Sequence, residues 1–214
     1  MSRDDLFKAI DVADEAKLRA ILKKDKSLAS SRSSDGVSAI LFTLYLAKFD
    51  LTKIVMTYEP EMDLYDLAAL NMHVELTAFL ETVADIDHLS GDGFSALHLA
   101  SFFGSLGTAE LLIEKGANVN IHAGNMSDLR PLHSACVSGQ DPIVNLLLKA
   151  GAEPDVRQTG GYTPLMMAAS LGNRPVVGLL LEYGADITIK SDDDRIAVDF
   201  AKAAGCEDLR DSLS

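Results

Sequence analysis

Residues 161–169 read GYTPLMMAA, and this stretch decides how the rest of the chain is interpreted. Similar stretches recur along the chain: GFSALHLA (93–100), RPLHSA (130–135) and, more weakly, RIAVDFA (195–201). Leucine-rich runs ending in Gly-Ala follow the three clearest copies: LLIEKGANVN (111–120), LLLKAGA (146–152) and LLLEYGAD (179–186). The leucines Leu97, Leu132 and Leu165 are separated by 35 and then 33 residues. A repeat of this length predicts stacked supersecondary units that share their cores.

The repeated residues have identifiable structural roles. A Ser or Thr such as Thr163 accepts a hydrogen bond at a helix N-terminus, and the following Pro164 fits the first turn, where no N–H is needed. Glycines between and after the helices permit positive φ angles and so end each helix sharply. Their expected positions are Gly104, Gly139 and Gly172 between helices, and Gly116, Gly151 and Gly184 after the second helix. Each copy therefore predicts an antiparallel helical hairpin.

Together these residues resemble the ankyrin repeat, whose pattern is Gly-x-Thr-Pro-Leu-His-x-Ala-Ala, an inter-helix Gly and Leu-Leu-x-x-Gly-Ala. The resemblance covers three successive copies and implies a mainly α solenoid of stacked helix-turn-helix hairpins with short β-hairpin fingers. It also implies that His98 and His133 hydrogen-bond the backbone of the neighbouring finger. A finger here is the turn that joins one hairpin to the next.

The N-terminal half follows a looser version of the pattern. DGVSAI (35–40) mirrors DGFSAL (92–97), and residues 5–60 and 63–120 resemble two copies of a two-hairpin unit. We predict a single domain over residues 1–214 with seven hairpins, near 5–24, 36–59, 63–82, 93–115, 129–150, 161–183 and 195–213. Since a lone hairpin cannot bury both faces, we expect an elongated, curved body with one continuous core.

The composition excludes several classes of protein. The formal charge is −13, spread over both halves, and this disfavours nucleic acids and anionic membranes as partners, because both need neutralising Lys and Arg. No apolar run reaches the ~20 residues that span a bilayer. The first residues lack a secretory pattern, and two cysteines form neither a disulfide framework nor a zinc site. We therefore expect a cytoplasmic protein.

Residues that carry chemistry are present but not arranged for it. His73, His88 and His122 are scattered, and the acidic run Asp192–Asp194 lacks the spaced ligands of a calcium loop. No glycine-rich phosphate loop occurs, and no nucleophile has a recognisable base. We predict no catalytic residues, no metal and no cofactor.

The resemblance instead implies a protein-binding surface, because family members usually grip partners with fingertips and with the exposed side of the first helix. By motif position, the candidate partner-binding residues are Phe94, Phe102, Phe103, Met126, Arg130, Val137, Ser138, Tyr162, Ser170 and Leu171. Aromatic residues and Met at positions not needed for stacking favour an apolar strip. Within an acidic surround, the strip would suit a partner with an apolar centre and a basic rim.

We predict a non-catalytic module that captures a protein partner on its concave face. A dedicated regulatory or chaperone-like subunit of one enzyme is an alternative, and an undetected hydrolase or transferase with a deep pocket is a remote one. We expect a monomer. A weak homodimer through the 36–59 hairpin, which carries Phe42, Tyr45, Leu46 and Phe49, is the alternative.

Overall fold

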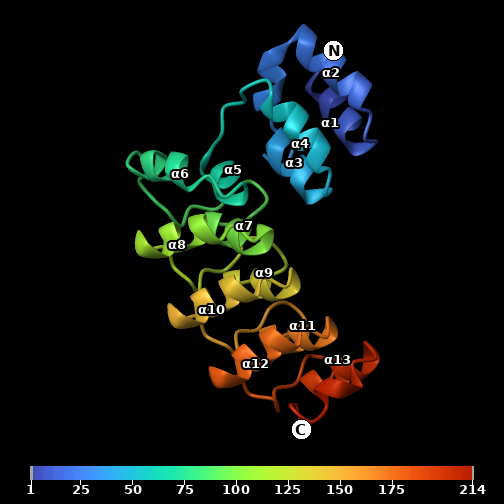
Figure 1. The fold of residues 1–214 in the computed structure, drawn as a ribbon, viewed down its shortest axis with the longest axis vertical. Coiled ribbons are helices and arrows are strands. Elements are labelled where there is room, and N and C mark those ends of the chain that lie inside the picture. Colours follow the sequence, from blue (N-terminus) through green and yellow to red (C-terminus); the bar gives the residue numbers. More distant parts are fainter. Residues whose placement is uncertain (1, 214) are drawn as a thin grey trace.

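The computed structural model describes residues 2–213, and helical hairpins stack side by side along its length (Figure 1). The α-helices are α1 (Arg3–Asp11), α2 (Glu15–Lys24), α3 (Ala39–Tyr45), α4 (Phe49–Met56), α5 (Leu64–Ala69), α6 (His73–Leu80), α7 (Ala96–Phe103), α8 (Leu106–Glu114), α9 (Pro131–Val137), α10 (Asp141–Lys149), α11 (Pro164–Ser170), α12 (Arg174–Glu182) and α13 (Ala197–Ala203). Short 3₁₀ turns, η1 (Lys26–Ser30) and η2 (Glu207–Leu209), follow α2 and α13. The predicted helical solenoid is confirmed.

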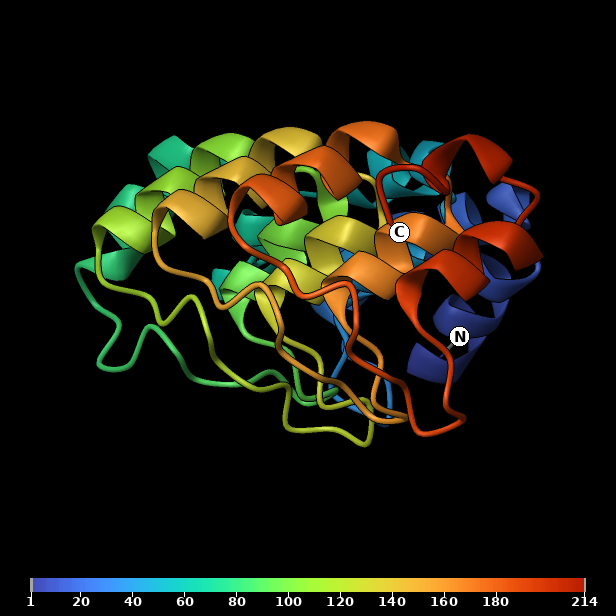
Figure 2. The same ribbon diagram turned by 90° about the horizontal axis from the view of Figure 1, so that it is seen from below.

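The hairpins form two layers of helices. The first helices of successive hairpins, α5, α7, α9, α11 and α13, pack in one row, called the inner helices below, and α6, α8, α10 and α12 pack in a second, outer row. The connections between hairpins project from one side of these layers (Figure 2). Both ends of the stack lean toward the side of the inner helices (Figure 1). This side is therefore the concave one.

Helix starts follow the predicted capping residues. Ser95 accepts a hydrogen bond from the backbone of His98, and Thr163 does the same for Met166 at 3.3 Å. Ser38 caps α3 by accepting from Leu41 N at 3.0 Å. These bonds satisfy N–H groups that have no partner inside the helix.

Helix ends follow the predicted glycines. The inter-helix glycine Gly139 has φ 70°, and Gly151, which follows the second helix of the same hairpin, has φ 92°. Such angles strain residues that carry a Cβ atom, so glycine suits these positions. The same left-handed geometry recurs in the neighbouring copies, at Gly104, Gly116, Gly172 and Gly184.

The fingers are tight turns rather than regular strand pairs. Typical closing bonds run from Gln158 N to Tyr162 O at 3.0 Å and from Ser191 N to Arg195 O at 2.9 Å. Within residues 2–213 the assigned strand pairing is one isolated antiparallel bridge between Arg32 and Ser38. Each finger spans so few residues before the next N-cap that a β ladder has no room to extend. The predicted short β-hairpins are therefore present only as single-turn fingers.

The apolar core is divided, which differs from the single continuous core expected above. One cluster of buried residues runs from Leu64 to Leu213, and the other occupies α1–α4 and adds Ala69 and Leu99. Figure 1 shows the N-terminal hairpins set apart from the remaining stack. The chain passes from α4 to α5 through residues 57–62 without forming a finger. With no finger there, the second and third hairpins are not joined as the later ones are.

The missing finger brings two distant turns together. The finger at 33–37 approaches the finger at 90–94 so closely that a Cβ atom on Gly91 would lie 2.5 Å from the carbonyl oxygen of Asp35. Arg32 also forms an ion pair with Asp63, with Nη2 2.6 Å from Oδ2. These contacts hold the N-terminal hairpins against the start of α5 and the finger at 90–94.

The last predicted hairpin is only half helical. After α13 the chain forms the single turn η2 in place of a second α-helix. Leu209 and Leu213 nevertheless point into the core, with 3% and 1% of their surfaces exposed. The C-terminal segment therefore covers the end of the stack.

Candidate functional site

Three exposed apolar side chains lie at the C-terminal ends of consecutive inner helices. Phe102 of α7 is 41% exposed, Val137 of α9 is 39% exposed, and Leu171, which follows α11, is 53% exposed. Each precedes the left-handed glycine of its hairpin by one or two residues. Because α7, α9 and α11 pack in order, the three side chains form a row along the concave side.

A small hollow of about 160 Å³ opens beside this row. Its lining comes from α3, α7, α9 and two fingers: Tyr45, Phe94, His98, Leu99, Phe102, Leu129, Ser134 and Val137. The surface turned toward the hollow is apolar. The row and the hollow together are called the concave groove below. Among the predicted residues, Phe94, Phe102 and Val137 meet here, and Leu171 extends the row.

The two adjacent phenylalanines have different surroundings. Phe103 stacks on Tyr45 with ring centroids 5.8 Å apart and an interplanar angle of 29°. Phe102 meets the edge of Phe103 at 5.1 Å and leaves more of its own surface in solvent. Phe103 therefore packs the N-terminal hairpins onto α7, and Phe102 is the more exposed ring.

The predicted finger residues also differ in how far their side chains are exposed. Met126 is 94% exposed at the tip of its finger, where its carbonyl oxygen accepts a 2.6 Å bond from Thr159. Arg130 is partly buried and donates from Nη1 to Asn120 O at 2.6 Å. Tyr162 meets the ring of Phe200 edge-on at 5.7 Å. Met126 is therefore exposed, whereas Arg130 braces its own finger and Tyr162 packs on α13.

The two predicted serines bond within their own helices. Ser138 donates to Ser134 O at 2.8 Å, and Ser170 donates to Met167 O at 2.8 Å. Ser170 is exposed and Ser138 is partly buried. Both lie beside the apolar row as small polar neighbours.

Tyr45 belongs to this surface, although motif position did not select it. Its hydroxyl donates to Oδ2 of Asp92 at 2.7 Å, and burial, together with that carboxylate, raises the pKa of Tyr45 well above its usual value. The available signal was the unusually apolar helix that contains Phe42, Tyr45 and Leu46. Phe42, Tyr45 and Leu46 line a hollow between α1, α3 and the finger at 33–37.

The two motif histidines are structural. His98 Nε2 lies 3.0 Å from Leu129 O, and His133 Nε2 lies 3.2 Å from Tyr162 O, so each reaches the next finger as predicted. Burial lowers the pKa of both rings to about 4. They are therefore neutral at physiological pH, and each holds its inner helix to the next finger.

A buried carboxyl group lies at the junction of the two cores. Asp66 is completely buried at the start of α5, where it accepts a short hydrogen bond from Ser38 and a 3.3 Å bond from Asp63 N. Burial and the nearby charge of Asp63 raise the pKa of Asp66 well above its ordinary range. Ionisation of Asp66 therefore makes the stability of the junction depend on pH.

The remaining polar groups have structural explanations. In the acidic run, Asp192 pairs with Arg157 at 2.9 Å, Asp193 with Arg195 at 2.7 Å, and Asp194 with Lys190 at 3.5 Å. Burial raises the pKa of the Cys136 thiol, which disfavours a reactive thiolate. Across residues 2–213 no group of three or more His, Cys, Asp or Glu side chains is arranged to hold a metal ion. No helix in that range is long and apolar enough to cross a membrane.

Comparison with known proteins identifies the repeats. A family model described as ankyrin repeats (3 copies) matches residues 65–158 and 123–191, which together make up more than half of the chain. This chain belongs to the ankyrin-repeat family. Ankyrin repeats are generally protein-interaction modules and are typically non-catalytic.

Several relatives share the repeat region. The E3 ubiquitin-protein ligase Ufd4 of Drosophila melanogaster is 42% identical over 81 residues, 38% of this chain and 3% of the relative. Protein phosphatase 1 regulatory subunit 27 of Mus musculus is 34% identical over 79 residues, 37% of this chain and 50% of the relative. A putative ankyrin repeat protein of Rickettsia felis is 25% identical over 130 residues, 56% of this chain and 43% of the relative. The chain thus spans half or less of the length of these relatives.

Proposed function

We propose that this ankyrin-repeat protein is a non-catalytic module that captures a protein partner along its concave groove, centred on residues 94–171. The observation that carries the proposal is the row of Phe102, Val137 and Leu171 beside an apolar hollow. Exposed apolar side chains grouped on one face often mark interaction surfaces, and aromatic anchors contribute strongly to binding. The row sits on rigid, consecutive helices, so little ordering entropy is lost on binding.

The net charge supports a particular kind of partner. With a formal charge of −13, the protein attracts basic surfaces and repels nucleic acids and anionic lipids. The proposed partner presents an apolar centre to the groove and basic residues at its rim. Opposite charges would mainly speed association and set specificity.

A matched pair of double variants tests the groove. Phe102→Ala/Leu171→Ala removes one ring and one aliphatic side chain from the row, and Phe49→Ala/Val74→Ala removes exposed counterparts elsewhere, 59% and 68% exposed. Partner capture from native extract, quantified by mass spectrometry, is expected to fall about tenfold for the first variant, as for interface anchors in general. It should be unchanged for the second. Equal capture by both folded variants would refute the groove.

A dedicated regulatory subunit of one enzyme is the second candidate function. It is favoured by the 34% identity with a mouse protein phosphatase 1 regulatory subunit, which is also short enough for the match to cover half of it. This candidate predicts one stoichiometric partner in the capture experiment, whereas a general adaptor predicts several. An enzyme would need converging acid and base groups in a deep pocket, and the shallow apolar groove does not favour that chemistry.

We further propose a monomer that acts in the cytoplasm. Cys136 and Cys206 are unpaired, which suits a reducing compartment. Phe49, on the hairpin considered for self-association, is the exposed ring that a homodimer would bury. Light scattering at several concentrations distinguishes the monomer from that dimer.

A further inference from the structure

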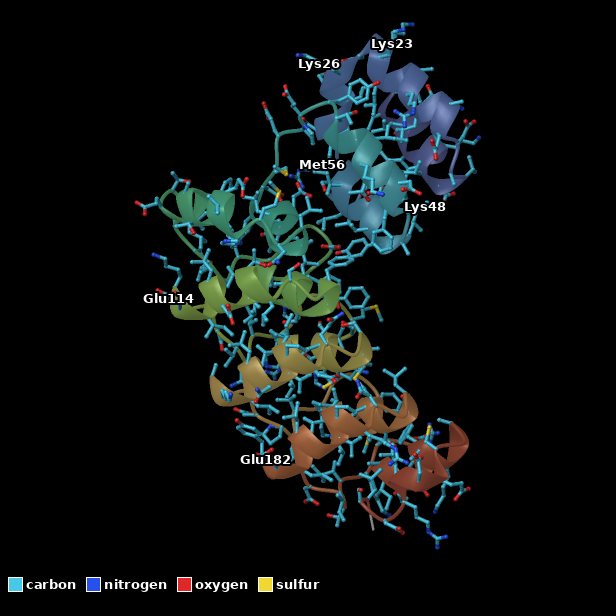
Figure 3. The ribbon with its side chains drawn as sticks, viewed as in Figure 1. Lys23, Lys26, Lys48, Met56, Glu114 and Glu182 are labelled. Atoms are coloured by element: carbon cyan, nitrogen blue, oxygen red, sulfur yellow. The ribbon has the colours of Figure 1, made fainter. Side chains whose placement is uncertain are left out.

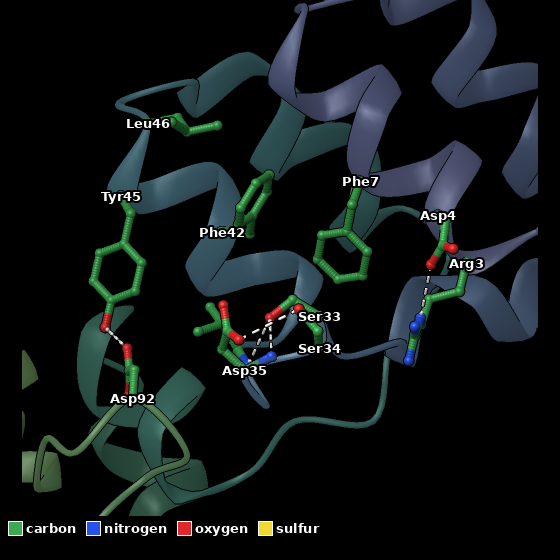
Figure 4. Close-up of a pocket in the computed structure, with 11 residues that line it drawn as sticks. Arg3, Asp4, Phe7, Ser33, Ser34, Asp35, Phe42, Tyr45, Leu46 and Asp92 are labelled. Carbon is green, nitrogen blue, oxygen red and sulfur yellow. Dashed lines mark hydrogen bonds and ion pairs between the residues drawn. The ribbon is translucent and has the colours of Figure 1, made fainter.

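A second and larger hollow adjoins the concave groove. It has a volume of about 630 Å³ and lies between α1, α3 and the finger at 33–37 (Figure 4). Tyr45 lines both this hollow and the smaller one, so the two are neighbours on the same side of the molecule. We call it the aromatic hollow.

Three rings from two helices form one wall of the aromatic hollow. Phe7 of α1 and Phe42 of α3 meet edge to face, with centroids 5.1 Å apart and an interplanar angle of 83°. Tyr45 continues the wall one helical turn further along α3 (Figure 4). None of the three rings is fully buried. The wall therefore offers π surface to a ligand.

Carboxylates surround this wall. Asp4, Asp35 and Asp92 line the hollow, and the cation that lines it, Arg3, is already paired with Asp4 at 3.1 Å. Asp92 accepts the Tyr45 hydroxyl, which fixes its position, and Asp35 is exposed beside Ser34. The side-chain donors to these two carboxylates are uncharged hydroxyl groups: Ser34 donates to Asp35, and Tyr45 and Ser90 donate to Asp92. The hollow thus combines aromatic surface with uncompensated negative charge.

We propose that the aromatic hollow receives an arginine side chain of the protein partner that occupies the adjoining groove. A planar guanidinium stacks on aromatic rings and donates paired hydrogen bonds to carboxylates, and it is less strongly hydrated than an ammonium group. An arginine at the edge of an apolar contact also fits the basic rim expected of the partner. The inference rests on the proposed function and adds the chemistry of one partner residue to it.

Titration of the isotopically labelled full chain with N-acetyl-L-arginine amide tests the hollow directly. The expected result is saturable NMR shifts at residues 33–37, Phe42 and Tyr45, with a Kd of about 1 mM, as suits so small a ligand. The citrulline analogue has nearly the same shape without the charge and should bind at least about tenfold more weakly. The lysine analogue should bind about threefold more weakly, because it lacks the planar fork.

Two variants separate the charge from the rings. Asp4→Asn/Asp35→Asn removes two exposed carboxylates, and Phe42→Leu keeps the apolar volume while removing a ring. Each should weaken arginine binding about fivefold. Glu114→Gln/Glu182→Gln makes the same charge change at exposed positions on the outer row, and it should leave the Kd within twofold. Glu114 lies at the end of α8 on the outer row (Figure 3).

The proposal is overturned if arginine and citrulline amides bind equally, if the shifts spread over the acidic surface without saturating, or if the control variant weakens binding as much as Asp4→Asn/Asp35→Asn. These outcomes are separate from failure of the proposed function, which is measured by partner capture with Phe102→Ala/Leu171→Ala. If arginine amide does not bind but partner capture still depends on the groove, this inference is wrong and the proposed function stands.

Discussion

The two halves of the molecule make the same turn between helices with different residues. In the C-terminal half the left-handed residue is glycine: Gly104, Gly139, Gly172 and Gly205. In the N-terminal half it carries a side chain: Ala13 (φ 56°), Ala47 (φ 53°) and Asn71 (φ 58°). Both halves keep the same left-handed backbone at this position. Stacking therefore requires that turn geometry, even where a residue with a Cβ atom adopts it at some cost in strain.

The irregular half also contributes what the regular half lacks. Hairpins α7–α12 supply an even row of exposed apolar side chains. The N-terminal hairpins add Tyr45, Phe42 and Phe7, which close one end of the groove with aromatic surface. The regular repeats therefore provide an evenly spaced stack of helices, and the irregular N-terminal hairpins add aromatic side chains at one end of the groove.

The largest expected effect comes from truncating each core separately. Leu132→Ala and Ile40→Ala remove side chains that are 1% exposed, one in each core, and each should cost about 2–5 kcal/mol of stability. Hydrogen exchange should show that Leu132→Ala loosens α7–α13 while α1–α4 keep their protection, and that Ile40→Ala does the reverse. Uniform loss of protection in both variants would mean that the cores unfold as one unit.

Acid should destabilise the regular half more than the N-terminal half. Unfolded histidine titrates near pH 6.5, but burial holds the pKa of His98 and His133 at about 4, so the unfolded chain binds more protons between these values. The stability contributed by each neutral ring is therefore lost as pH falls from about 6.5 to 4, at up to about 1.4 kcal/mol per pH unit. Urea denaturation at several pH values measures this, with a flat profile as the contrary result.

Asp66, at the junction, should act in the opposite direction. Its pKa is raised in the fold, so the stability it contributes is present at low pH and is lost as pH rises above about 4, the ordinary carboxyl value. Asp66→Asn keeps a polar group of similar size without the charge. Relative to the wild type, the variant should therefore be more stable at pH 8 than at pH 4.5, and a constant difference would contradict the raised pKa.

Exchanging the turn residues should produce effects of about 1 kcal/mol with opposite signs. Gly139→Ala places a Cβ atom 3.5 Å from Asn173 Nδ2, an ordinary contact, so its cost of about 1 kcal/mol reflects φ alone. Ala47→Gly should relieve the same strain and stabilise the protein by up to about 1 kcal/mol. Thermal denaturation of the two variants compares them, and a shift of the same sign in both would show that φ is not the cause.

The smallest effect is expected at the contact between the halves. Tyr45→Phe removes the 2.7 Å bond to Asp92 but keeps the ring stacked on Phe103. The bond is partly exposed, so we expect a loss of about 0.5 kcal/mol and faster amide exchange in the finger at 90–94. Unchanged exchange in that finger would indicate that stacking alone holds the halves together.

The sequence predicts the structure correctly where the determining contacts repeat between adjacent hairpins. The cap at Thr163 and the finger bond of His98 both follow from motif position, because each is local or involves the next copy. The divided core could not be foreseen, since it depends on a finger that is missing between α4 and α5. That gap lets α3 reach α7 past one intervening hairpin.

The exposure of the candidate site residues was harder to predict than the fold. Phe102 and Phe103 are adjacent in sequence and equally apolar, and the position of Tyr45 decides which ring is the more covered. Likewise, Arg130 and Tyr162 occupy finger positions that the repeat pattern leaves free, yet Arg130 bonds to Asn120 of its own finger and Tyr162 packs on Phe200 of α13. Exposure depends on packing between repeats that differ in sequence, which no single repeat specifies.

Hydrogen exchange on the complex with its captured partner tests the concave groove most directly. Capture on the concave face predicts added protection in three segments of the inner row, residues 94–103, 131–138 and 164–171, together with residues around Tyr45. Exchange in α8, α10 and α12 of the outer row should be unchanged. Protection confined to the outer helices, with the inner row exchanging as in the free protein, would contradict capture on the concave face.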